Sequence, residues 1–218
     1  MVKSKSLMEK SKKTFNHLKI HTQYSICEGA IKIDDLSKYC KDNKVKAIGM
    51  SDTSNLCGSL EFSEQISKSK TQPIIGSQIK FKFNDLIGSL PIIAKNSDGY
   101  KELINLSSRS FLENSNIDEP HCKIALLLNC SKNLIILSGG ISNLSGSLFQ
   151  KGRLNELEKL YFSLKKNSGD NFYIEIQRHG DLNEKNFENF NLSVSKKIKA
   201  PIIAVSYTHL TLPTIYSV

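Results

Sequence analysis

The stretch HLKIHTQYSICEG, residues 17–29, contains the start of the fold and the first candidate site residues. Its opening residues alternate between polar and apolar, which predicts a strand that directs His17, Lys19 and His21 to one face. Two imidazoles on one face are typical of a metal site. The ammonium of Lys19 between them repels a divalent cation and cannot ligate it while protonated. We therefore expect a metal-site frame with a built-in cation, in which Lys19 pairs with Glu28 or Asp52.

Outward from this stretch, short apolar runs alternate with segments of helical period. The expected strands are residues 15–20, 45–50, 73–81, 90–94, 134–137, 172–177 and 201–204, and Ile124 to Leu128 is also of strand length. Short apolar strands are typical of a parallel sheet buried on both faces. Between them, Leu36, Leu103, Leu157 and Val194 mark the core-facing sides of four helices, and Ser97 is the expected N-cap of the second. The pattern predicts the α/β class, as a parallel barrel or a doubly wound sheet.

Polar residues follow apolar runs at six places in the expected strands, and Gln78 comes after the run that ends at Ile75. These residues are His21, then Asp52 and Thr53, then Gln78, then Lys95 and Asn96, then Ser138 to Gly140, and finally Arg178 and His179. Because the carboxyl ends of parallel strands gather at one edge, the six groups are expected to converge on one rim. The alternative is that they are polar only because loops are polar.

Composition narrows the class of protein. The chain has 218 residues, is 39% hydrophobic, and carries 30 Lys and Arg against 21 Asp and Glu, for a net charge of +9. This predicts one ordinary domain, and the lack of a long apolar run excludes a membrane protein. Five cysteines without a CxxC pair argue against a disulfide framework or a zinc ribbon, and they predict free thiols and a cytoplasmic location. The chain has no tryptophan, and its aromatic residues do not alternate with basic ones. Direct recognition of nucleic acid by this segment is therefore not indicated.

Further motifs follow the opening stretch in a fixed order. They are SDTSNLCG at 51–58, PIIG at 73–76, AKNSDGY at 94–100, LSGG at 137–140 and IEIQRHG at 174–180. Together with residues 17–29 they resemble the PHP (polymerase and histidinol phosphatase) domain family, in the form found at the amino terminus of bacterial DNA polymerase III alpha subunits. The resemblance covers about residues 15–204 and implies a distorted (β/α)7 barrel.

The resemblance also implies which positions once held metal. Metal-binding members use His, Glu, Cys and Asp ligands for phosphoester hydrolysis. By this resemblance His21, Glu28, Asp52 and His179 stand at vestigial site positions, whereas Lys19, Thr53, Gln78, Ser89 and Gly140 are substitutions. The surviving ligands cannot assemble a cage for two metal ions. We expect no catalytic residue and no bound Zn²⁺ or Mn²⁺ in this segment, and Mg²⁺ would serve only a parent polymerase.

The expected organisation is a basic flexible tail at 1–14, a PHP domain at 15–204 and a non-family tail at 205–218. The last segment contains no Lys or Asn, a composition break that suggests foreign, artefactual sequence.

The expected function is that of a PHP domain fragment from a replicative polymerase. It would support the polymerase body of the same chain, dock a proofreading exonuclease subunit and meet DNA only through the parent. The alternative is a stand-alone metal-dependent phosphoesterase, similar to a histidinol phosphatase or a 3′-end exonuclease. A third reading is an α/β domain unrelated to replication.

Overall fold

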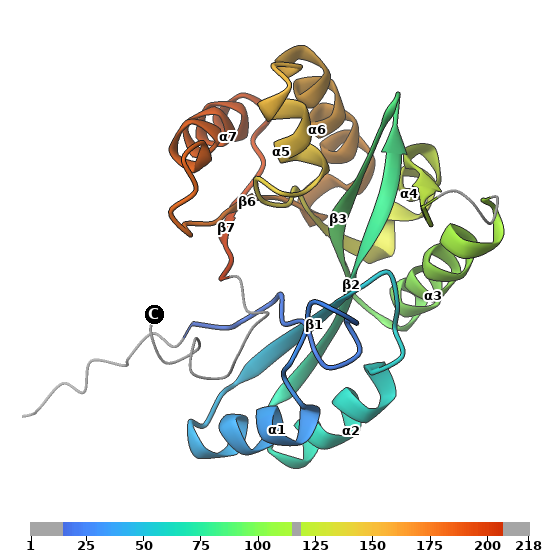
Figure 1. Ribbon diagram of the computed structural model, residues 1–218, viewed down its shortest axis with the longest axis vertical. Helices are drawn as coiled ribbons and strands as arrows, with labels where there is room; N and C mark the ends of the chain where they lie inside the picture. The colour runs from blue at the N-terminus through green and yellow to red at the C-terminus, as the bar shows by residue number, and fades with distance from the viewer. Residues whose placement is uncertain (1–14, 115–118, 207–218) are drawn as a thin grey trace, which may run out of the picture.

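The structure is a computed structural model that describes residues 15–114 and 119–206. Its strands are β1 (Ala47–Thr53), β2 (Gln72–Phe83), β3 (Leu86–Ala94), β4 (Cys122–Lys123), β5 (Leu134–Leu137), β6 (Phe172–Ile176) and β7 (Ile202–Ala204). They form a curled sheet in the order β1-β2-β3-β5-β6-β7, with β4 paired to β2 (Figure 1). The predicted α/β class is therefore confirmed.

Helices pack against this sheet. They are α1 (Ile33–Asp42), α2 (Ser59–Lys68), α3 (Ser97–Leu112), α4 (Ile124–Cys130), α5 (Leu144–Gln150), α6 (Leu154–Ser168) and α7 (Glu184–Ile198), with 3₁₀ turns η1 (Ser131–Asn133) and η2 (Gly169–Asn171). In Figure 1, α1 and α2 lie together beside β1 and β2, and α5, α6 and α7 gather at the other end of the sheet. Among the helices of the described ranges, none is long and apolar enough to cross a membrane.

The sheet is mixed, which corrects the expectation of parallel strands. β1 and β2 are parallel, as are β5, β6 and β7, but β3 runs antiparallel to both β2 and β5. The reason is the connection between β2 and β3, which is only two residues long, Asn84 and Asp85. A turn of that length joins antiparallel neighbours, whereas a parallel pair needs a long crossover.

The predicted first strand, residues 15–20, is an extended segment that meets β1 at the bridge between Ile20 and Met50. The Gly49 N–H bonds to the His17 carbonyl at 2.7 Å, and the Ile20 N–H bonds to the Gly49 carbonyl at 3.1 Å. A regular ladder would place the Leu18 carbonyl opposite the Gly49 N–H, so the segment carries one extra residue, as in a β-bulge. Gly49 permits this close approach, because a Cβ there would lie 2.7 Å from the Leu18 carbonyl oxygen. The bulge interrupts the expected common face between His17 and Lys19.

Two smaller expectations are also corrected. Ile124 to Leu128 belongs to helix α4. The N-cap of α3 is Asn96, whose side-chain oxygen accepts a hydrogen bond from the Gly99 N–H at 2.8 Å, so the predicted cap at Ser97 was one residue late. Asn96 is extended and therefore has the backbone geometry that a cap requires.

The sheet separates two outer cores from an inner one. Outside, α1 and α2 bury Ile33, Leu36 and Phe62 against Ile48 and Met50 of β1. A larger core joins helices α3 to α7 to the other strands and contains the predicted Leu103, Leu157 and Val194. Inside the curl, a smaller cluster contains Ile93, Leu137 and Val205. The interior beyond this cluster is lined by polar side chains.

The chain continues on the sheet past β7. The Val205 N–H donates to the Ile176 carbonyl at 3.0 Å, and the Val205 side chain is buried beside Ile93 and Leu137. Val205 is therefore packed into the domain, although it is the first residue of the predicted non-family tail. Residues 207–218 of that tail, and the predicted basic tail at 1–14, lie outside the described residues.

Candidate functional site

A chain of hydrogen bonds links four side chains at the predicted rim. His21 Nε2 lies 2.6 Å from Gln78 Nε2, Gln78 Oε1 accepts from Asn143 Nδ2 at 2.9 Å, and Asn143 Nδ2 also donates to Ser89 Oγ at 2.7 Å. His21, Gln78 and Asn143 are buried. Two substituted positions, Gln78 and Ser89, are thus connected to the retained His21.

The amide assignments in this chain determine the tautomer of His21. Because Gln78 Nε2 is a donor, His21 Nε2 must be the unprotonated acceptor, and the proton resides on Nδ1. His21 Nδ1 lies 3.3 Å from Ser25 Oγ and 3.5 Å from a carboxylate oxygen of Glu28. Both ring nitrogens are therefore engaged by protein groups.

Asp52 is buried and holds the loop that follows the first segment. Its carboxylate accepts hydrogen bonds from the Thr22 N–H at 2.6 Å, from Thr22 Oγ1 at 2.7 Å and from Ser25 Oγ at 2.7 Å. Burial raises the pKa of Asp52 more than these hydrogen bonds lower it. Its lone pairs face donors of residues 22 to 25, so Asp52 organises the loop.

Glu28 and Thr53 lie at the outer edge of the rim. Thr53 Oγ1 donates a hydrogen bond to the Glu28 carboxylate, whose side chain is about half exposed. The substitution at Thr53 therefore faces the retained acidic residue at Glu28.

Lys19 forms a buried ion pair with Glu175 of β6, at 3.0 Å between Nζ and Oε1. The two side chains are 1% and 0% exposed. This partner differs from the expected Glu28 or Asp52. The curl of the sheet is the reason, because it brings β6 opposite the first segment, 156 residues earlier in the chain.

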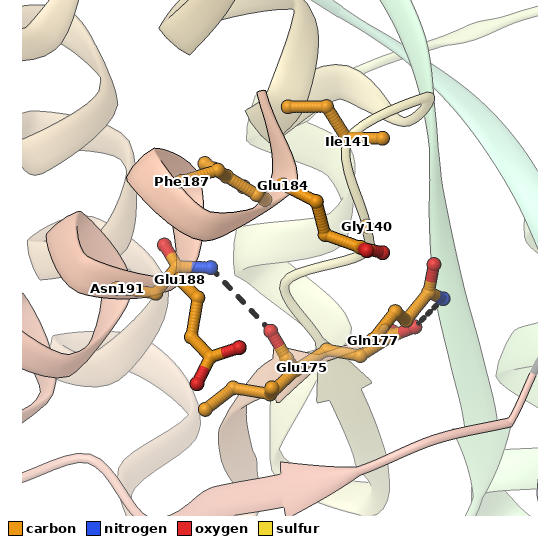
Figure 2. Close-up of a pocket in the computed structure, with 9 residues that line it drawn as sticks. Gly140, Ile141, Glu175, Gln177, Glu184, Phe187, Glu188 and Asn191 are labelled. Carbon is orange, nitrogen blue, oxygen red and sulfur yellow. Dashed lines mark hydrogen bonds between the residues drawn. The ribbon is translucent and has the colours of Figure 1, made fainter. Parts of the chain in front are cut away.

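Gln177 extends this pair toward Gly140. Gln177 Nε2 donates to the Glu175 carboxylate, and the Gln177 amide lies where a Cβ on Gly140 would stand. The Gly140 N–H donates to Asn143 Oδ1 at 2.8 Å, which joins this group to the His21 chain. Figure 2 shows Gln177 and Glu175 side by side below Gly140, and the amide of Asn191 on the Glu175 carbonyl.

The cavity in Figure 2 has a volume of about 10 Å³ and is also lined by Ile141, Glu184, Phe187 and Glu188. This is room for about one water molecule and is far too small for a phosphate ester. Larger grooves, of about 430, 550 and 570 Å³, are lined by α2 with α3, by the loop before α7, and by α6 with α7. None of these three grooves is lined by His21, Asp52 or Gln78.

Two predicted rim groups have other surroundings. Lys95 and Asn96 contact Asn133 and Asn171, which precede β5 and β6, because the antiparallel β3 ends at the opposite edge of the sheet. His179 contacts Glu184 at the start of α7, with 3.1 Å between Nδ1 and the carboxylate, and its N–H donates to the same carboxylate.

Several of the buried side chains at the rim are poor ligands for a divalent cation. Within residues 15–114 and 119–206, no group of three or more His, Cys, Asp or Glu side chains is placed to hold a metal ion. Gln78 places an amide on His21, Asn143 bonds to Gln78, and Lys19 carries an ammonium two residues before His21 in the sequence. An ammonium cannot ligate, and a carboxamide is a weak ligand beside the carboxylates and imidazoles of catalytic metal sites.

Sequence reasoning missed Glu175, Gln177 and Asn143. Glu175 and Gln177 are polar at every second position of an otherwise apolar strand, a signal that two side chains point into the barrel. Asn143 follows the Gly139-Gly140 turn and carries no comparable pattern, because its role depends on the distant Gln78 and Ser89.

The chain is similar to known proteins over nearly its whole length. The family model described as PHP domain matches residues 17–179. The DNA polymerase III subunit alpha of Caulobacter vibrioides is 31% identical over 93% of this chain and 18% of its own length. Those of Vibrio cholerae and Helicobacter pylori are each 31% identical, over 88% and 94% of this chain. The chain spans less than a fifth of the length of these relatives.

Among solved structures, a Bifidobacterium adolescentis protein assigned as a metal-dependent phosphoesterase matches with a TM-score of 0.59. It is 12% identical, and the match covers 89% of this chain and 87% of that one. At this identity the match concerns the fold alone, and it confirms the expected PHP-type barrel.

Proposed function

Because the chain belongs to the PHP domain family, we propose that it is the N-terminal PHP domain of a DNA polymerase III alpha subunit whose metal site has become a structural centre. The observation that carries the proposal is the buried pair of Lys19 and Glu175, continued through Gln177. The positively charged Lys19 ammonium takes a position at which a catalytic member of the family would need a ligand for a metal cation.

The rim network supports a structural role. A hydrolase of this class needs exchangeable positions on the metal for substrate and for the attacking water. In this chain both ring nitrogens of His21 face protein groups, and Asp52 is engaged by Thr22 and Ser25. These contacts tie residues 19–28 to β1, β2 and β6, which suits a scaffold.

The parent's activity and partners are part of the same proposal. The parent is a DNA-directed DNA polymerase in the cytoplasm that uses Mg²⁺ and contacts DNA through regions beyond this chain. The PHP domain supports the polymerase body and offers a docking surface to the proofreading exonuclease subunit. The similarity to alpha subunits over 88 to 94% of this chain supports this context.

Hydrolysis of a chromogenic phosphate ester with Mn²⁺ or Zn²⁺ tests the proposal against its alternative, the stand-alone phosphoesterase. We expect the same background rate for the wild type and for His21→Ala. Metal-dependent turnover that disappears in His21→Ala would instead establish the hydrolase.

Metal content provides a second test. Lys19→His replaces the ammonium by an imidazole beside His21, so we expect more bound Zn²⁺ or Mn²⁺ than in the wild type, whereas the matched control Lys19→Met gains no ligand. Equal metal content in both variants would contradict the assignment of Lys19 to a former ligand position.

The docking role is tested by titrating the proofreading exonuclease subunit of the same organism against the 218-residue protein in a calorimeter. We expect saturable binding that is unaffected by His21→Ala, because that change lies in the buried interior. If no heat of binding is measured, the docking role is wrong. The proposed assignment to a polymerase subunit would then still be tested by the hydrolysis and metal-content experiments.

A further inference from the structure

Two buried polar atoms in the barrel interior have no hydrogen-bond partner within the described part of the chain. They are Oγ of Ser51, a residue of β1, and Oε2 of Glu175 in β6. Ser51 is 0% exposed and Glu175 is 1% exposed, so bulk water does not reach either atom. His17 Nδ1 is a third such atom, but it belongs to the segment before the bulge.

The strand geometry places both atoms on the inner side of the sheet. Ile20 and Met50 are paired, and both side chains are buried in the outer core beneath α1 and α2. Because side chains alternate along a strand, Lys19 and Ser51, each one residue away, face the interior. There Lys19 meets Glu175.

Because the Lys19–Glu175 pair is charged and buried, the stability of the interior depends on which donors reach the two carboxylate oxygens of Glu175. Glu175 Oε1 accepts from both Lys19 and Gln177, whereas Oε2 is buried and accepts no hydrogen bond from the described residues. A buried oxygen without a donor is costly, and internal water is the usual way in which folded proteins satisfy such groups.

We propose that the barrel interior binds ordered water, hydrogen-bonded to Ser51 Oγ and to Glu175 Oε2 beside the Lys19 ammonium. Water fits both atoms because it donates to the carboxylate and either donates to or accepts from the hydroxyl. A metal ion does not fit, because it would be repelled by Lys19. The inference rests on the geometry of the interior and does not depend on the role in replication.

Serine-to-alanine changes test the proposal through the sign of a stability shift. If Ser51 Oγ bonds to internal water, Ser51→Ala loses that bond and lowers the Tm. If Ser51 Oγ lacks any partner, Ser51→Ala removes a costly group and raises the Tm, which would overturn the proposal.

Ser77→Ala is the matched control, because Ser77 is also 0% exposed, lies on the neighbouring strand and donates to the Asp52 carbonyl at 2.7 Å. We expect both variants to lower the Tm by similar amounts.

A crystal structure of the 218-residue protein provides a test that does not depend on variants. We expect solvent density within hydrogen-bond distance of Glu175 Oε2, with no anomalous signal after growth with Mn²⁺ or Zn²⁺. An anomalous peak at that position, or a protein side chain bonded to Oε2, would refute the water site.

Discussion

Replacing Lys19 by methionine should be among the most damaging single changes in the domain. The substitution keeps the approximate length of the side chain but leaves the Glu175 carboxylate buried, with a side chain that is 0% exposed. At the observed 3.0 Å and an effective dielectric constant of about 20, the attraction that is lost is about 5 to 6 kcal/mol.

Relaxation and partial hydration offset part of this loss, and breaking a buried pair on one side costs about 3 to 5 kcal/mol. We therefore expect Lys19→Met to lower the free energy of unfolding by about that amount, a large share of the roughly 5 to 15 kcal/mol typical of a domain. Urea denaturation followed by circular dichroism measures the change.

Two further variants make this measurement specific. Lys19→Met combined with Glu175→Met removes both charges, and it should recover most of the loss because paired apolar side chains replace buried ion pairs at little cost. Lys101→Met removes an exposed ion pair with Asp98, in which the side chains are 77% and 70% exposed, and should cost less than about 1 kcal/mol. If Lys19→Met costs no more than Lys101→Met, or if the double variant is no more stable than the single one, the pair does not stabilise the interior as argued.

Three other predictions concern the cap of α3, the buried rim carboxyl and the thiols. Asn96→Ala removes the N-cap and should lower the free energy of unfolding by about 0.5 to 2 kcal/mol, and Ser97→Ala should lower it by less. A larger loss for Ser97→Ala than for Asn96→Ala in urea denaturation would mean that Ser97 is the cap. Because burial raises the pKa of Asp52, the stability from this group is present at low pH and is lost as the pH rises through its folded-state pKa, so the unfolding free energy of the wild type minus that of Asp52→Asn should fall with rising pH. For Asp85, the hydrogen bond from Arg153 lowers the pKa, so the unfolding free energy of the wild type minus that of Asp85→Asn should rise with pH. If the two differences change with pH in the same direction, the opposite pKa shifts of Asp52 and Asp85 are contradicted. All five cysteines are free thiols, and burial raises the pKa of three of them to about 11. A thiol reagent should therefore label the two exposed cysteines well before these three, as followed by mass spectrometry. Equal labelling rates would argue against the packing of the three. The fast pair is Cys27 and Cys57, and the slow set is Cys40, Cys122 and Cys130.

The sequence by itself determined the class of fold and most of its elements. Apolar runs with flanking turn residues located β5 at its observed bounds, Leu134–Leu137, and located β6 and β7 to within one residue at each end. Helical spacing identified Leu36, Leu103, Leu157 and Val194 as core residues, and all four are buried. These features are readable because hydrophobic periodicity is a local property of the chain.

Tertiary structure alone decided the bulge before Ile20 and the partner of Lys19. Each depends on which distant segments the curled sheet brings together, and periodicity carries no information about that. The sequence showed a lysine between two histidines and so indicated a cation within a metal-site frame. Only the fold, by placing β6 opposite the first segment, identified Glu175 as the carboxylate that neutralises it.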